Sequence, residues 1–258
     1  MELFGLPIWV VLLVWVGVFC ASFMDSIAGG GGLISLPAYL LSGLPAHVAL
    51  GTNKLSSCIG TVASTVRYVK NGYVNWLLAV PAIVLALIGA HFGTKLQLSV
   101  DEYFLKILLL FVLPVIAVIL LKEKDLPEES RPLNEWKRRA IVWGSSLIIG
   151  AYDGFYGPGT GTFLLLCYCF LAKIDVRTAS GNVKLVNLSS NFGALVTSLH
   201  AGKVLLPLGL SAAVFAIAGQ YIGSGLAIKN GSKIVRPFIF IVLILLIGDV
   251  VFEVLEIA

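Results

Sequence analysis

Two lysines stand out because each lies inside an apolar segment, where a charged side chain is costly. Lys54 and Lys184 each lie seven residues into the segments 47–69 and 177–199, roughly 10 Å from the segment's end. A charged lysine in a membrane-spanning segment costs about 3 kcal/mol on insertion scales. Snorkelling of the long stem to the interface is the alternative. Two lysines at matched depth favour a function: each ammonium needs an anion, from a carboxylate or from a bound substrate.

Hydrogen-bonding side chains beside each lysine supply donors for an oxyanion. The first set is Thr52, Asn53, Ser56 and Ser57, and the second set is Asn182 and Asn187. A lone Ser or Thr in a helix commonly bonds to its own backbone, so each cluster means more than any member. Three further candidates to line the same cavity lie in the segments 74–94 and 204–228: His91, Gln220 and Tyr221. Ordinary hydrogen bonding between helices is the alternative for these three.

Glycine-rich runs precede a short apolar segment twice in the chain. The glycines that we single out as anion-binding candidates are Gly30, Gly31, Gly32, Gly159 and Gly161. Bare amides at the start of a helix bind anions through their unpaired N–H groups and through the helix dipole. Close packing of helices is the alternative reason for glycine.

An aspartate stands at the head of each glycine run, Asp25 in one and Asp153 in the other. Three roles are open for each acid. It can cap the helix that follows, pair with Lys54 or Lys184, or carry a proton across the membrane, as buried acids do in pumps and transporters.

The composition is that of a polytopic membrane protein. Charged residues make up 12% of the 258 residues, half of the roughly 25% in soluble domains, and the mean hydropathy is +0.97. The net charge of +4 is spread over short loops without a basic stripe, so we expect no nucleic-acid partner. The four cysteines lie in apolar segments without metal-binding spacing, so we expect no metal and no cofactor.

Ten apolar segments predict α-helices. They cover residues 5–24, 29–44, 47–69, 74–94, 103–121, 139–152, 160–172, 177–199, 204–228 and 234–257. The segments 29–44, 139–152 and 160–172 are shorter than the ~20 residues of a full span. We interpret them as half-helices or re-entrant segments, which survive at membrane depth only when protein covers them or when they line a cavity.

One polar stretch, "KEKDLPEESRPLNEWKRR", divides the chain. We expect a first transmembrane repeat at 1–121, a cytoplasmic linker at 122–138 and a second repeat at 139–258. With the linker inside, ten crossings place more Lys and Arg on the inside than eight crossings do. The positive-inside rule therefore favours ten segments with both chain ends outside.

The two halves of the chain resemble one another. "DSIAGGGGL" at 25–33 matches "DGFYGPGTGTF" at 153–163, after which an offset of 130 aligns Gly51 with Gly181 and Lys54 with Lys184. Each half has about five segments. Because five is an odd number, the two halves insert in opposite orientations. The expected fold is therefore an all-α polytopic membrane protein of two inverted repeats with 8–10 spans. Such transporters bind substrate at the repeat interface near the midplane.

These motifs resemble a known family. "DSIAGGGGLISLPAYLLSGLPAHVALGTNKLSS" is similar to the first-half signature of the sulfite exporter TauE/SafE family, the 4-toluene sulfonate uptake permeases. "GFYGPGTGTF" and "RTASGNVKLVNLSSN" resemble its second-half signature, and the resemblance covers essentially the whole chain.

The resemblance implies a non-enzymatic permease for sulfur-containing anions such as sulfite, thiosulfate or organosulfonates, driven by the proton gradient. We expect a multi-pass monomer or homodimer in the cytoplasmic (inner) membrane of a prokaryote, with membrane lipid, a small anion and protons as partners. Two other classes remain open. An anion channel is one. An intramembrane aspartyl protease using Asp25 and Asp153 is the other, although its Gly-x-Gly-Asp motif is absent and nearby lysines oppose a shared proton.

Overall fold

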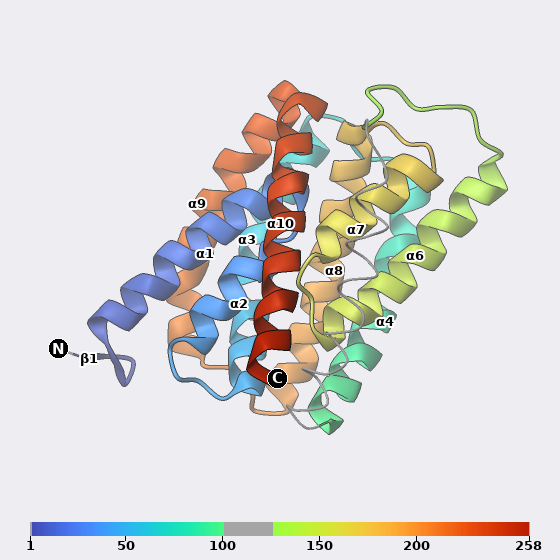
Figure 1. Cartoon of the computed structure of the whole chain (residues 1–258). Helices are drawn as coiled ribbons and strands as arrows, with labels where there is room; N and C mark the ends of the chain where they lie inside the picture. Colours follow the sequence, from blue (N-terminus) through green and yellow to red (C-terminus); the bar gives the residue numbers. More distant parts are fainter. Residues whose placement is uncertain (1, 101–125, 258) are drawn as a thin grey trace.

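The computed structural model describes residues 2–100 and 126–257, and these residues are almost entirely helical (Figure 1). The first half contains α1 (Ile8–Ala28), α2 (Gly32–Leu40), α3 (Ala46–Lys70) and α4 (Trp76–Ser99). The second half contains α6 (Glu135–Phe155), α7 (Thr160–Leu166), the π-helical turn η1 (Cys167–Leu171), α8 (Val176–His200), α9 (Leu206–Asn230) and α10 (Ser232–Ile257). A hairpin of β1 (Glu2–Leu3) and β2 (Leu6–Pro7) precedes α1. The all-α prediction is confirmed, and the predicted segment 103–121 lies outside the described residues.

Long apolar helices surround a polar centre. Of the described helices, α1, α4 and α9 are long and apolar enough to cross a membrane. Their outer faces expose large apolar side chains, such as Trp9 at 64% and Phe92 at 63%, as expected where lipid is the solvent. By contrast, α3 and α8 bury many polar side chains. The chain therefore keeps its polar groups inside, between the two halves.

The short helices occur where the glycine runs predict them. α2 has nine residues, and α7 has seven before η1. At 1.5 Å per residue, α2 is about 14 Å long, half of the ~30 Å hydrocarbon core, so it does not cross the membrane alone.

The prediction of a short segment at 139–152 is wrong. α6 has 21 residues, because it begins at Glu135 within the expected linker. Asn134 caps it: the Asn134 side chain accepts hydrogen bonds from the N–H groups of Trp136 and Lys137. An amide side chain at this position satisfies the first free amides of a helix.

Helices of one half pack against helices of the other half. α1 packs along α9, and α6, the counterpart of α1, packs along α4, the counterpart of α9. Matched glycines permit both contacts. A Cβ atom at Gly219 would lie 2.5 Å from the carbonyl oxygen of Phe19, and one at Gly89 would meet the carbonyl oxygen of Leu147 in the same way. Small residues allow such close helix approach, which explains why these glycines recur at the repeat offset.

The halves run in opposite directions, as the inverted-repeat prediction requires. In Figure 1, α1 begins at the lower end of the molecule and α6 at the upper end. The start of α1 and the end of α10 lie at the lower end, opposite the linker. α2 and α7 each turn back from a glycine break, so α1–α2 and α6–α7 form two hairpins entering from opposite ends (Figure 1). Their tips meet, because Thr162 Oγ1 donates to the carbonyl of Ala28 at 2.9 Å.

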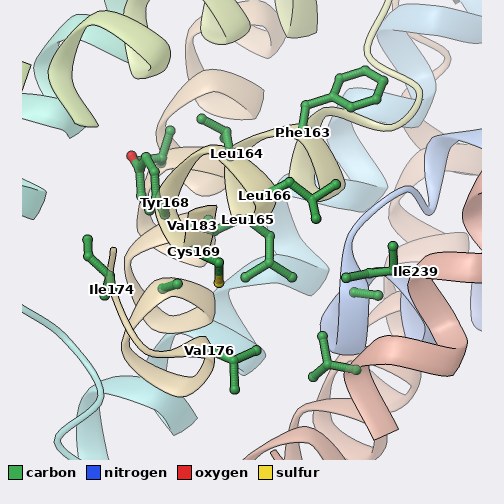
Figure 2. Packing of buried hydrophobic residues seen from close by; sticks show 14 of the residues in the cluster. Phe163, Leu164, Leu165, Leu166, Tyr168, Cys169, Ile174, Val176, Val183 and Ile239 are labelled. Carbon is green, nitrogen blue, oxygen red and sulfur yellow. The ribbon is translucent and has the colours of Figure 1, made fainter. Parts of the chain in front are cut away.

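A large apolar cluster fixes the second hairpin. Figure 2 shows Phe163, Leu164, Leu165 and Leu166 of α7 packed with neighbours that include Val183 of α8 and Ile239 of α10. Tyr168 of η1 is fully buried in this cluster, and its hydroxyl lies 2.7 Å from Ser146 Oγ. The apolar packing holds α7 in place although the helix has only seven residues.

The described part of the linker ties the starts of two helices together. Glu128 accepts a hydrogen bond from the N–H of Ser232 at 2.9 Å and pairs with Arg177 at 3.2 Å. Hydrogen bonding with Ser232 holds the pKa of Glu128 below its ordinary value. Since Arg177 lies on α8 and Ser232 begins α10, this exposed carboxylate fastens both helices to the linker.

Candidate functional site

Each lysine singled out in the sequence pairs with the acid of the other repeat. Lys54 Nζ on α3 lies 2.9 Å from Asp153 Oδ1 on α6, and Lys184 Nζ on α8 lies 2.8 Å from Asp25 Oδ2 on α1. All four side chains are largely buried. Of the three roles open for the acids, the geometry therefore shows pairing, and it shows pairing between the repeats.

The two acids accept different additional hydrogen bonds. Asp25 Oδ2 also accepts a hydrogen bond from Gln220 Nε2 at 2.8 Å, and Asp25 Oδ1 accepts one from the N–H of Gly31 at 3.4 Å. Asp153 Oδ2 accepts one from Ser190 Oγ at 2.7 Å. Asp25 therefore also links the end of α1 to the amides at the start of α2.

A cavity lies beside these pairs, between the two repeats. Its volume is about 40 Å³. Polar side chains from both repeats line it: Asn53, Lys54, Ser57, Thr61, Asn187, Asn191 and Gln220. Both acids and both glycine runs line it too, the latter at Gly30, Gly31, Gly32, Gly157 and Gly161. The cavity thus gathers most of the residues predicted from the sequence.

Several polar lining residues were not predicted: Ser22, Ser35, Thr61, Tyr156, Thr160 and Asn191. Asn53, Ser57 and Thr61 are four residues apart along α3 and share one face. Asn187 and Asn191 form the equivalent face of α8 at the repeat offset of 130. The helical spacing combined with the internal repeat would have found Thr61 and Asn191.

Lys184 does not line the cavity described by the structure. Its side chain is 2% exposed, and its ammonium donates to both the carboxylate and the backbone carbonyl of Asp25. The two lysines therefore differ in environment although they match in sequence.

Thr52 and Asn182 satisfy backbone amides instead of facing the cavity. Thr52 Oγ1 accepts a hydrogen bond from the N–H of Leu205 at 2.9 Å, and Asn182 Oδ1 accepts one from the N–H of Asn75 at 3.1 Å. Leu205 and Asn75 are the residues that precede α9 and α4. The two contacts are related by the repeat, so both side chains anchor the start of a helix in the opposite half.

Four other candidates also lie away from the described cavity. Ser56 accepts a hydrogen bond from the Tyr39 hydroxyl at 2.9 Å, and Gly159 precedes α7 in a left-handed conformation. His91 Nδ1 lies 2.9 Å from Thr197 Oγ1. Tyr221 is 58% exposed, under the Arg67 guanidinium at 4.3 Å. For His91, the geometry matches the alternative of a bond between helices.

Replacing Thr52 with valine tests its structural role. We expect the variant to lose about 1–3 kcal/mol of stability, because the half-buried N–H of Leu205 loses its acceptor while the side-chain shape is kept. Thermal unfolding in detergent measures this loss. The half-saturating concentration for transport should match that of the unchanged protein, and a changed value at equal folded yield would place Thr52 in the binding site.

Comparison with known proteins agrees with this architecture. The profile of the family described as sulfite exporter TauE/SafE matches residues 14–249. The chain belongs to this family. The TauE/SafE match includes both aspartates, both lysines and both glycine runs.

Relatives within the TauE/SafE family cover most of their own length and most of this chain. A probable membrane transporter protein, ORF9, of Sinorhizobium sp is 38% identical over 237 residues, 90% of this chain and 88% of that protein. The probable membrane transporter protein YfcA of Escherichia coli K12 is 34% identical over 226 residues, 86% and 82% of the two chains. A Haemophilus influenzae relative of the same description is 31% identical over 241 residues, 91% and 92%. No solved structure matches significantly. Family and relatives indicate a membrane transporter.

Proposed function

We propose that the protein is a secondary transporter that moves small sulfur-containing oxyanions, such as sulfite, thiosulfate or organosulfonates, across a prokaryotic cytoplasmic membrane. Transport proceeds by alternating access and is coupled to the proton gradient. The observation that supports this proposal most directly is the polar cavity between the repeats, where Lys54 faces amide and hydroxyl side chains of α3 and α8.

The chemistry of the cavity suits a compact oxyanion. Such an anion carries several acceptor oxygens, and burying it requires donors that replace its water. An ammonium group, amide side chains and glycine amides are donors of this kind, and hydrogen bonds to a charged group are the strong ones. Because the cavity is small, with a volume of about 40 Å³, we expect sulfite and thiosulfate to be preferred over bulky aryl sulfonates.

The architecture supports alternating access. Inverted repeats place two equivalent gates on opposite sides of one central site. Here the hairpins α1–α2 and α6–α7 enter from opposite ends and meet beside the cavity (Figure 1). Opening either hairpin would expose the site to one side only.

The ion pairs argue against the aspartyl protease. That chemistry needs two carboxylates that share one proton. Here each carboxylate is held by a lysine of the opposite repeat, at 2.9 Å for Asp153 and 2.8 Å for Asp25. Each carboxylate therefore faces an ammonium group rather than a second carboxylate.

Counterflow into proteoliposomes tests the proposed function. Vesicles loaded with unlabelled sulfite should take up labelled sulfite with saturating kinetics, and thiosulfate, sulfoacetate, isethionate and taurine should be compared as competitors with size-matched carboxylates. A preference for carboxylates would contradict the sulfur assignment. Ohmic current without saturation in a planar bilayer would instead identify an anion channel.

A further inference from the structure

The two ion pairs differ in how firmly the lysine is held. Lys184 donates to two oxygen atoms of Asp25, the backbone carbonyl and the carboxylate, and is 2% exposed. Lys54 contacts Asp153 at 2.9 Å, its one polar partner within residues 2–100 and 126–257, and it lines the cavity. An anion in the cavity can therefore reach Lys54 but not Lys184.

The two acids also differ in how they accommodate a proton. Both oxygens of the Asp25 carboxylate face groups that can only donate, the Lys184 ammonium at Oδ2 and the N–H of Gly31 at Oδ1. Asp153 faces the Ser190 hydroxyl at 2.7 Å, and that hydroxyl also lies 3.1 Å from the carbonyl of Asn187. A hydroxyl both donates and accepts. Ser190 can thus donate to ionised Asp153, or turn to Asn187 and accept from the protonated acid.

Charge balance also distinguishes Asp153 from Asp25 as the acid that can take up a proton. Protonated Asp25 would leave the Lys184 ammonium buried without a counter-ion, which is strongly unfavourable. Protonated Asp153 leaves Lys54 facing the cavity, where a bound anion replaces the carboxylate. The other ionisable groups that line this space are Asp25 and Tyr156. On α4, which packs along α6, His91 is bonded to Thr197 and does not line the described cavity.

We propose, building on the transport function above, that Asp153 carries the coupled proton and Lys54 is its exchangeable partner, whereas Asp25 and Lys184 stay paired throughout. A proton from one side forms an O–H bond with the Asp153 carboxylate, and the substrate anion takes the carboxylate's place at Lys54. On the other side the anion leaves, the proton returns to water and the pair re-forms. One proton accompanies one negative charge, so transport of a monoanion is electroneutral.

The test compares counterflow of thiosulfate, which unlike sulfite does not itself take up a proton near neutral pH, with thiosulfate accumulation driven by a pH gradient. In the unchanged protein, the half-saturating concentration for counterflow should fall as pH is lowered, by up to about tenfold per pH unit for one coupled proton. In Asp153→Asn, it should become independent of pH, and gradient-driven accumulation should be lost. Glu135→Gln changes an exposed acid on the same helix, and it should behave as the unchanged protein. Purified protein should also take up one proton per bound anion, a measurement that needs no variant.

The outcomes separate this inference from the function on which it rests. Gradient-driven accumulation by Asp153→Asn, or thiosulfate binding without proton uptake, would overturn the assignment of Asp153. The double variant Asp25→Asn with Lys184→Met should keep the pH dependence, and losing it at normal folded yield would also overturn the proposal. Absence of counterflow in the unchanged protein, for every sulfur anion, would instead refute the transport function itself.

Discussion

Lys184→Met is expected to yield little folded protein, whereas Lys54→Met is expected to fold and to lose transport. Removing one partner of a buried ion pair costs about 3–5 kcal/mol, because the other charge is left uncompensated. Lys184 also bonds the carbonyl of Asp25 in the last turn of α1, and its loss leaves the negative end of that helix beside an unpaired carboxylate. Both the uncompensated charge and the exposed helix end result from losing the contact between Lys184 and Asp25.

Removing Lys54 should cost less, because Lys54 contacts the Asp153 carboxylate alone among the described residues, whereas Lys184 also bonds the carbonyl in the last turn of α1. Transport should nevertheless fall by about tenfold or more, since a hydrogen bond to a charged group contributes about 1.5–3 kcal/mol. Size-exclusion yield and thermal unfolding in detergent measure folding, and sulfite counterflow measures function.

Second-site changes and an exposed lysine provide the controls. Adding Asp25→Asn to Lys184→Met removes the orphaned charge and should recover folded yield. Adding Asp153→Asn to Lys54→Met should not recover transport. Lys203→Met alters an exposed lysine and should leave both measurements unchanged. Equal behaviour of Lys54→Met and Lys184→Met would show that the two pairs are equivalent and would contradict this account.

The helices and their breaks were predictable because they depend on local properties of the chain. Apolar runs predicted the helices, and glycine runs predicted α2 and α7, since glycine adopts the positive φ angles found at Gly29 and Gly159. The start of α6 was predicted at residue 139 instead of Glu135, because the first turn of this helix is polar. Asn134 caps that turn, and the motif was recognisable as a helix start.

The ion pairs were not predictable from sequence, because either lysine can neutralise either acid. Only the fold decides which groups meet: it brings Lys54 on α3 to Asp153 on α6, and Lys184 on α8 to Asp25 on α1, and these residues are far apart in the chain. The partners lie in opposite repeats: Asp25 pairs with Lys184, not with Lys54. An internal repeat identifies equivalent residues but not the pairs they form.

The roles of neighbouring polar residues were likewise undecidable without the fold. Thr52 and Asn53 are adjacent on α3 and therefore point about 100° apart around the helix axis. Asn53 lines the cavity, whereas Thr52 bonds the N–H that precedes α9. Both residue types suit either task, so the position of α9 decides between them.

Gly29→Ala should destabilise the protein by about 3 kcal/mol or more, from two separate causes. Gly29 has a φ of +81°, a conformation in which a side chain is strained by about 1–3 kcal/mol. A Cβ atom there would also overlap the backbone of Gly161 and Thr162, where the two hairpin tips meet. Backbone on both sides leaves no flexible side chain to give way. We expect a large drop in the thermal unfolding temperature and the loss of counterflow.

Two other glycines separate these causes. Gly43 has a φ of +80° with no atom within 4 Å of a Cβ position, so Gly43→Ala measures strain alone. Gly144 lies within α6 with equally open space, and Gly144→Ala should stabilise the protein by about 0.5–1 kcal/mol through helix propensity. The difference between Gly29→Ala and Gly43→Ala then measures the contact between the tips. Equal destabilisation by both would show that the hairpin tips do not press against one another, and the central meeting point of the two repeats would have to be reassigned.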